Sequence, residues 1–327
     1  MTSFSASTGR SPQQVGRRAR LVSTIQRQAA LLALVLLLFF GALRYEGFFS
    51  VYNITELLRY NSMFGLIALG MTFVIMTGGI DLSVGAVAAL ASVLAALLSP
   101  YGLLPAIGLP VLVGILVGLF NGWVITRLAI APFIGTLAML LAARGVALIL
   151  ANNAAVNVDT SAGFINLGLH SMAGVPIPVL IVAVAYMLGL LVLNYTRFGR
   201  HVLAVGGNEE AARLMGLPVN RIKLSVYALS GGLAGLAGVI LTALTFTGLP
   251  TEGVGWELSA IAAVVVGGTL LTGGVGSVGT TLVGVLLLGL ILNMLNFTGL
   301  GVYWQSVIRG VFLLIVVIFQ NRLVRRH

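Results

Sequence analysis

The chain of 327 residues is 59% hydrophobic and only 8% charged, and its net charge is +10. Soluble domains carry roughly a quarter charged residues, so this composition excludes a water-soluble globular protein. The absence of cysteine excludes disulfides, thiol catalysis and cysteine-ligated metals. We therefore expect an all-α fold, that of a polytopic helical membrane protein.

Apolar runs recur along the whole chain, and a helix needs about 20 apolar residues to span a bilayer. We predict about ten transmembrane helices, at 31–49, 61–77, 82–98, 104–126, 132–151, 177–194, 226–246, 257–271, 275–296 and 302–319. Two regions are weak as complete spans, because 257–271 is short and 77–85 is interrupted by Gly78, Gly79 and Asp81. Either region can be a half-helix or a re-entrant segment, which is tolerated where other helices shield its backbone.

The distribution of positive charge predicts the orientation of the chain. With both termini cytoplasmic, 14 of the 18 Lys and Arg residues lie on the inner side, and Arg44 and Arg59 lie on the outer side. This is the bias of the positive-inside rule, which explains the charge better than nucleic-acid binding does. We expect a basic cytoplasmic tail (1–28), a transmembrane domain (29–320) and a second basic tail (321–327), and no nucleic-acid partner.

Glycine-rich strings occur in both halves of the chain. TGGIDLSVG (77–85) and TGGVGSVG (272–279) are similar, through either a true internal repeat or chance. The second string contains a G-x-G-x-x-G pattern, but it lies between apolar runs and no acidic residue follows it, which favours close helix approach over a dinucleotide site. Two stripes of small residues predict helix packing, either within one subunit or between two: Gly114, Gly118 and Gly122, and Gly231, Gly235 and Gly238.

The inner loop 195–225 predicts a short amphipathic helix. Asn208 is a suitable N-cap, and Glu209 and Glu210 in the first turn favour the helix dipole. Good helix formers follow, and the run ends at a glycine and a proline: Ala211, Ala212, Arg213, Leu214, Met215, Gly216 and Pro218. Leu214 and Met215 need a cover, which can be a partner, the protein's own surface or lipid.

Three blocks of sequence identify a family. EAARLMG (210–216) resembles the E-A-A-x-x-x-G loop of ABC importer permeases, in which this loop is the coupling helix that docks into a groove on the ATPase. Residues 196–217, 70–90 and 257–284 are similar to the ribose-type sugar permeases (carbohydrate uptake family 2). Within the third block, GTLLTGGVGSVG looks nearer to galactofuranose permeases. The resemblance covers about residues 45–320.

The resemblance implies a permease subunit that moves a monosaccharide across the bacterial inner (plasma) membrane. The expected sugar is a pentose or a hexose, furanose forms included. It implies an ABC ATPase, a second permease subunit that is identical or homologous, and a periplasmic or lipid-anchored sugar-binding protein as partners, within membrane lipid. The chain has a single lysine, Lys223, and no Walker A string, so ATP and Mg are expected on the partner ATPase and no cofactor on this chain. The coupling helix is expected at about 208–217, with Ala211 and Ala212 small enough for close docking.

Polar residues within or beside the spans are candidates for the substrate path, since ionisable groups are costly in lipid. They are Asn61, Asp81, Asn121, Arg144, Asn293 and Asn296. N-capping of the next helix is the alternative role of Asp81, and packing between helices that of the amides. Glu252 is a candidate docking contact for the binding protein, with a solvated loop as its alternative. No catalytic constellation and no metal site are expected.

Two other functions fit parts of the pattern. A branched-chain amino-acid ABC permease has a related architecture but must accommodate a charged ligand. A stand-alone secondary transporter would use ionisable residues within the membrane, for which Asp81, Arg144 and Arg309 are the only candidates.

Overall fold

The computed structural model describes residues 12–160, 163–301, 303–308, 310–311, 314–315 and 318. The longer helices of this part are α1 (Pro12–Arg44), α2 (Val51–Met76), α3 (Val84–Leu98), α4 (Leu103–Arg127), α5 (Pro132–Leu150), α7 (Ile177–Tyr195), α10 (Val219–Thr245) and α12 (Val278–Phe297). The shorter elements are η1 (Ser99–Tyr101), α6 (Asn166–Leu169), α8 (Arg197–Gly207), α9 (Glu209–Leu214), α11 (Trp256–Val266), β1 (Val156–Asn157), β2 (Ser171–Met172), β3 (Val175–Pro176) and β4 (Thr247–Gly248).

The helical, polytopic membrane architecture is confirmed. Within the described residues, seven helices are long and apolar enough to cross a bilayer, and Gln28–Arg44 and α11 are shorter apolar helices. The tenth predicted run, 302–319, is only partly described, with residues 303–308 helical. The count of ten and the position of the termini therefore stay predictions. Residues 1–11 of the first predicted tail and the whole second tail (321–327) lie outside the described part.

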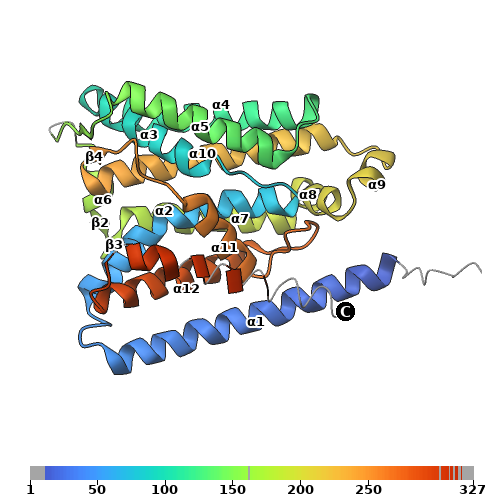
Figure 1. Cartoon of the computed structure of the whole chain (residues 1–327), viewed down its shortest axis with the longest axis horizontal. Helices are drawn as coiled ribbons and strands as arrows, with labels where there is room; N and C mark the ends of the chain where they lie inside the picture. Colours follow the sequence, from blue (N-terminus) through green and yellow to red (C-terminus); the bar gives the residue numbers. More distant parts are fainter. Residues whose placement is uncertain are drawn as a thin grey trace, which may run out of the picture.

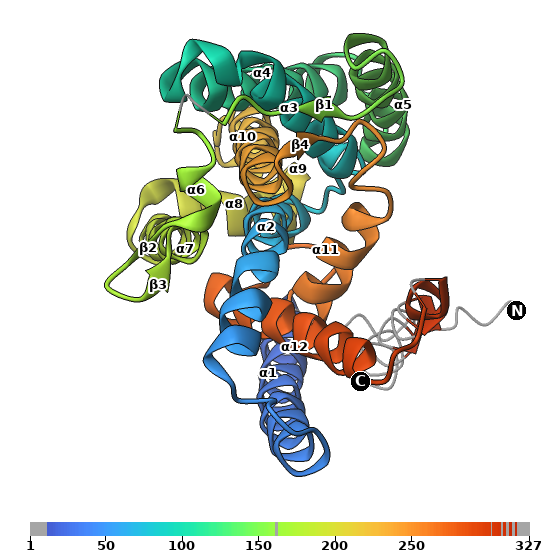
Figure 2. The same ribbon diagram turned by 90° about the vertical axis from the view of Figure 1, so that its left-hand side faces the viewer.

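The interior is built around α2 and α10. α10 packs against α4, α3 and α2, and α2 also contacts α7, α11 and α12. Seen from one end, α2 lies between α10 and α12, with α3, α4 and α5 beyond α10 (Figure 2). The residues of α2 from Leu66 to Met76 are buried without a break, which explains why this helix has no polar face in its second half.

The glycine stripes pack α10 against α4 and, at Gly238, against α3 within one subunit. A Cβ added at Gly114 would overlap the Gly231 carbonyl oxygen, and one added at Gly118 would overlap the Tyr227 carbonyl oxygen. A Cβ at Gly122 would lie 2.8 Å from the Leu224 Cα. Of the two possibilities that the sequence left open for these residues, packing within the subunit is the one observed.

Both regions predicted to be weak spans are interrupted helices. α2 ends at Met76 and α3 begins only at Val84, so residues 77–83 of the string 77–85 form a turn between two helices. α11 has 11 residues, and at 1.5 Å per residue it reaches about 16 Å, half of a hydrocarbon core. The string 272–279 ends the connection from α11 to α12 and runs into the first two residues of α12. The element before it is a helix and not the strand that a dinucleotide fingerprint requires.

The connecting elements gather at opposite ends of the bundle. α6 and the short strands lie at one end and α8 and α9 at the other (Figure 1). β1 pairs antiparallel with β4, in the register Val156 to Gly248, and β2 pairs with β3. The fold thus separates the long connection 152–176 from the loop 195–225, as the charge distribution predicts.

Candidate functional site

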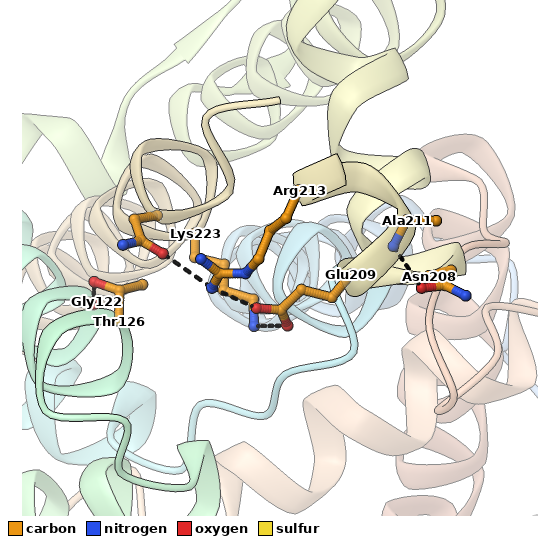
Figure 3. Close-up of polar contacts among 8 residues, drawn as sticks. Gly122, Thr126, Asn208, Glu209, Ala211, Arg213 and Lys223 are labelled. Carbon is orange, nitrogen blue, oxygen red and sulfur yellow. Dashed lines mark hydrogen bonds and ion pairs between the residues drawn. The ribbon is translucent and has the colours of Figure 1, made fainter. Parts of the chain in front are cut away.

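The inner loop folds into two short helices, each started by a side-chain cap. The Thr196 hydroxyl accepts a hydrogen bond from the Gly199 N–H at 3.3 Å and begins α8. The Asn208 side-chain oxygen accepts from the Ala211 N–H at 2.9 Å and begins α9 (Figure 3). Gly216 follows with φ +80°, a left-handed conformation that ends the helix and turns the chain toward α10. The predicted cap, helix and end are all present at 208–217.

Ion pairs attach α9 to the base of α10. The Glu209 carboxylate accepts from the Lys223 ammonium at 2.5 Å and from the Arg213 guanidinium at 2.8 Å. Arg213 also donates to the Asn220 side-chain oxygen at 3.1 Å, so both helices share one polar cluster (Figure 3). Burial alone would raise the pKa of the Glu209 carboxyl, but the hydrogen bonds and charges of Lys223 and Arg213 outweigh it, and the pKa lies below its ordinary value. Glu209 is therefore ionised and holds α9 in place at neutral pH.

The outer face of α9 is exposed and partly apolar. Leu214 is 85% exposed and Met215 is 70% exposed, and Glu210 and Gly216 are exposed beside them. Large apolar side chains at a polar end of the molecule indicate a surface that a partner covers. The expectation that Ala212 faces such a partner is wrong, because Ala212 is 0% exposed and packs into the main core of this chain. Its small side chain lets α9 lie close to its own subunit.

Asp81 lies at the centre of a buried polar cluster (residues 80–83 with Asn121, Thr136 and Ser230). One carboxylate oxygen accepts from the Ser83 N–H and hydroxyl, and the other accepts from the Ser230 hydroxyl at 2.9 Å. The Asn121 amide donates to the Ser83 hydroxyl at 2.9 Å. The proposed N-cap role of Asp81 is corrected, because Ser83 is the residue that precedes α3 and Asp81 instead joins the α2–α3 turn to α10.

The other polar candidates do not share one site. Asn61 borders a cavity of about 330 Å³ between α2, α11 and α12, together with Phe64 and Ser259. Asn293 exchanges amide hydrogen bonds with Asn53, a residue that the sequence reasoning missed, at 2.8 and 3.3 Å. Asn296 accepts from the Gln305 amide at 2.9 Å, near the exposed end of α12. Of the six candidates, the structure brings together Asp81 and Asn121 only.

Arg144 fixes the loop that precedes α11. Its guanidinium donates to the Pro250 carbonyl at 2.6 Å and to the Glu252 carbonyl. Glu257 and Glu252 are its electrostatic partners, whereas the sequence left a pairing with Asp81 open. The Glu252 side chain is exposed, in the connection between β4 and α11. Arg309 lies outside the described residues.

Comparison with known proteins shows the family to which the chain belongs. The model of a family described as "Branched-chain amino acid transport system / permease component" matches residues 53–317. The ribose import permease protein RbsC of Escherichia coli is 39% identical over 314 residues, which cover 94% of this chain and 97% of that protein. RbsC of Bacillus subtilis is 41% identical over 309 residues, with 94% and 96% covered. The L-arabinose ABC transporter permease protein AraH of Azospirillum brasilense is 39% identical over 299 residues, with 91% and 88% covered.

No solved structure matches the chain. The family model and the relatives each extend over most of the chain, including the α8–α9 loop and both interrupted helices. The chain is a multi-pass membrane protein that belongs to this permease family and, within it, to the ribose-type sugar permeases of ABC importers.

Proposed function

We propose that the chain is the transmembrane subunit of an ATP-driven importer that carries a monosaccharide across the inner membrane of a bacterium. One observation carries the mechanism: α9 presents Leu214 and Met215 outward while Glu209 and Ala212 attach it to its own subunit. A rigidly held helix with an exposed apolar face is suited to receive force from a partner. The resemblance of EAARLMG (210–216) to the coupling-helix loop of ABC permeases supports this assignment.

The partners follow from the same proposal. A separate ABC ATPase binds the face formed by Asn208, Glu210, Arg213, Leu214, Met215 and Gly216, and it holds ATP and Mg. A second permease subunit, identical or homologous, completes the membrane part. A periplasmic or lipid-anchored sugar-binding protein delivers the sugar at the opposite end, where Glu252 is a docking contact. Both chain termini and α9 are then cytoplasmic.

The sugar passes a surface of neutral donors, acceptors and aromatic faces. The cavity beside Asn61 is lined mostly by apolar side chains and offers the polar groups of Asn61 and Ser259 together with the Phe64 ring, which packs on Trp256 with ring centroids 4.9 Å apart. The buried cluster around Asp81 has no exposed group at its centre, because Asp81 and Asn121 are each 1% exposed. We assign that cluster to holding the helix break, and Asn61 to the path.

Reconstitution tests the function. Proteoliposomes would contain the chain with its ATPase and binding protein, and uptake of ribose, L-arabinose and a furanose sugar would be measured with and without ATP. Uptake that requires ATP and the ATPase supports the proposal. Uptake without any ATPase would instead indicate a secondary transporter, and competition by leucine but not by sugars would indicate an amino-acid permease.

A further inference from the structure

Three separate segments contact one another through their backbone atoms, directly before α9. They are the end of α2 with its turn (Met76–Gly79), the turn before α12 (Thr272–Gly274) and the end of α8 (Gly206–Gly207), and we name this contact the glycine junction. The Gly274 N–H donates to the Met76 carbonyl oxygen at 3.0 Å, which joins the first two segments directly. The third segment is followed at once by Asn208, the N-cap of α9.

At three positions of the glycine junction, Gly206, Gly273 and Gly274, the packing leaves no space for a side chain. A Cβ added at Gly206 would overlap the Met76 carbonyl oxygen and lie 2.6 Å from the Gly274 nitrogen. A Cβ at Gly274 would lie 2.7 Å from the Gly207 Cα, and one at Gly273 would lie 2.9 Å from the Gly206 carbonyl oxygen. Backbone atoms cannot rotate away as a side chain does. A movement of one of the three segments is therefore passed directly to the other two.

The contact connects α9 to both interrupted helices. The Met76–Gly79 segment continues into the turn that the Asp81 cluster binds to α10, and Thr272–Gly274 continues into α12. Four residues before Met76 in α2, the Thr72 hydroxyl lies 2.9 Å from the Thr281 hydroxyl, which joins α2 to α12. A displacement of α8 therefore reaches the helix breaks on both sides of the subunit interior through short, non-flexible contacts.

We infer that Gly206 is a positioning residue for transport, through which α8 and the two helix-break turns move as one body when the ATPase displaces α9. This inference rests on the proposed function, because it requires a partner that moves the coupling helix. It adds a specific route from the exposed face of α9 to α2 and α12. The similar strings 77–85 and 272–279 acquire a common role, since each supplies one turn of the glycine junction.

Neighbouring glycines provide a matched pair of variants. Gly206→Ala inserts a methyl group into the glycine junction, whereas Gly207→Ala adds one where no atom lies within 4 Å. We expect Gly206→Ala to co-purify with the ATPase but to lose sugar-stimulated ATP hydrolysis and uptake by roughly 5- to 150-fold, the usual range of coupling between sites. Gly207→Ala should behave like the wild type. Wild-type stimulation and uptake in Gly206→Ala would overturn the inference.

A cross-link tests the same inference without crowding the backbone. Gly207 and Thr272 are both exposed, and the natural chain has no cysteine. The variants Gly207→Cys and Thr272→Cys are combined and joined by the shortest bifunctional thiol reagent that reacts. If the segments move as one body, cross-linked transporters retain at least half of the uptake of the uncross-linked double variant. Loss of uptake on cross-linking, or a yield of cross-link that changes on trapping with ATP, would show relative movement and overturn the inference.

Failure of the proposed function has a different signature. It would appear in the wild-type protein, as uptake that does not depend on ATP or on the ATPase. Failure of the inference would appear only in the comparison of variants, with ATP-dependent uptake intact in the wild type. If Gly206→Ala does not reach the membrane, the cross-linked pair decides, because it leaves Gly206 unchanged and the new side chain at position 207 meets no atom within 4 Å.

Discussion

The Lys223 ammonium of α10 lies 2.5 Å from the Glu209 carboxylate in the first turn of α9. The Lys223 side chain is only 15% exposed, whereas the Glu209 side chain is 39% exposed and also binds Arg213. The lysine is therefore the member that loses most if the pair is broken, because a shielded charge would remain without its anion. The pair places a six-residue helix, too short to be stable alone, on a long one.

Glu209→Gln is expected to loosen α9. The loss is a few tenths to about 1 kcal/mol, since the carboxylate is partly exposed and screened by solvent. Faster hydrogen exchange of the α9 amides in the purified permease measures it. Glu210→Gln, on the exposed side of the same turn, is the control and should leave exchange unchanged; equal rates in both variants would contradict the role of the pair.

The same pair predicts a dependence on pH. The pKa of Glu209 lies below its ordinary value of 4.5 in the folded protein, so the pair's stabilisation is complete above that value. It is lost as the pH falls through the lowered pKa, when the carboxyl takes up a proton. The emission of a fluorophore on Met215→Cys should stay constant over the neutral range and change only under acid conditions, and Glu209→Gln should abolish that acid transition.

Met215→Glu tests the exposed face of α9 as the surface that binds the ATPase. Burial of a methionine contributes about 1.5–3 kcal/mol, so its loss from the interface should weaken binding of the ATPase roughly tenfold or more. Met172→Glu is a matched control, since Met172 is also 70% exposed but lies in β2 at the opposite end of the molecule (Figure 1). Co-purification with the ATPase measures both. Equal retention of the ATPase by the two variants would remove α9 from the interface.

Ala212→Arg should damage the permease itself. Ala212 is 0% exposed in the main core, and overfilling such a site typically costs about 1–3 kcal/mol. The thermal midpoint of the detergent-solubilised variant should fall even without the ATPase. Leu214→Arg, two residues away on the exposed face, should keep the wild-type midpoint. An unchanged midpoint in Ala212→Arg would mean that α9 does not pack as described.

Hydropathy predicted most of the membrane helices because their apolar runs and their helical lengths coincide. α5 runs from Pro132 to Leu150, against the predicted 132–151. For α2, hydropathy predicts a start at residue 61, ten residues later than the observed start at Val51, because Asn53, Glu56 and Arg59 lower the hydropathy of its first turns. These groups are paired in the structure, Arg59 with Glu56 at 3.0 Å and Asn53 with Asn293. The first pair has the i,i+3 spacing of helix neighbours, whereas the second joins two helices and cannot be read from sequence spacing.

The candidate site was predictable in position but not in orientation. The cap, the acidic first turn and the final glycine are local signals, and they located α9 correctly. Whether Ala212 or Leu214 faces inward depends on how α8 and α10 hold the helix, which is a tertiary contact. The glycine junction was equally hidden, since Gly206 and Gly207 are adjacent in sequence yet only Gly206 has atoms within 4 Å of an added Cβ.

Single cysteines test the orientation in the membrane. Met172→Cys and Met215→Cys lie in exposed segments at opposite ends, and the chain contains no other cysteine. An impermeant maleimide added to intact cells with an opened outer envelope should label Met172→Cys only, as the positive-inside bias requires. Inverted vesicles should give the reverse pattern. Labelling of Met215→Cys in the intact preparation would place α9 outside and remove any contact with a cytoplasmic ATPase.

Glu252→Gln tests docking at the outer end. The exposed carboxylate would steer a basic residue of the binding protein, and such long-range attraction acts mainly on association and is screened by salt. The concentration of binding protein that gives half-maximal ATP hydrolysis should rise in the variant at low salt, and the difference should vanish at high salt. Glu46→Gln, which also removes an exposed carboxylate beyond the end of α1, is the control and should have no effect. Equal salt dependence in Glu252→Gln and the wild type would leave Glu252 as a solvated loop residue whose backbone carbonyl accepts from Arg144.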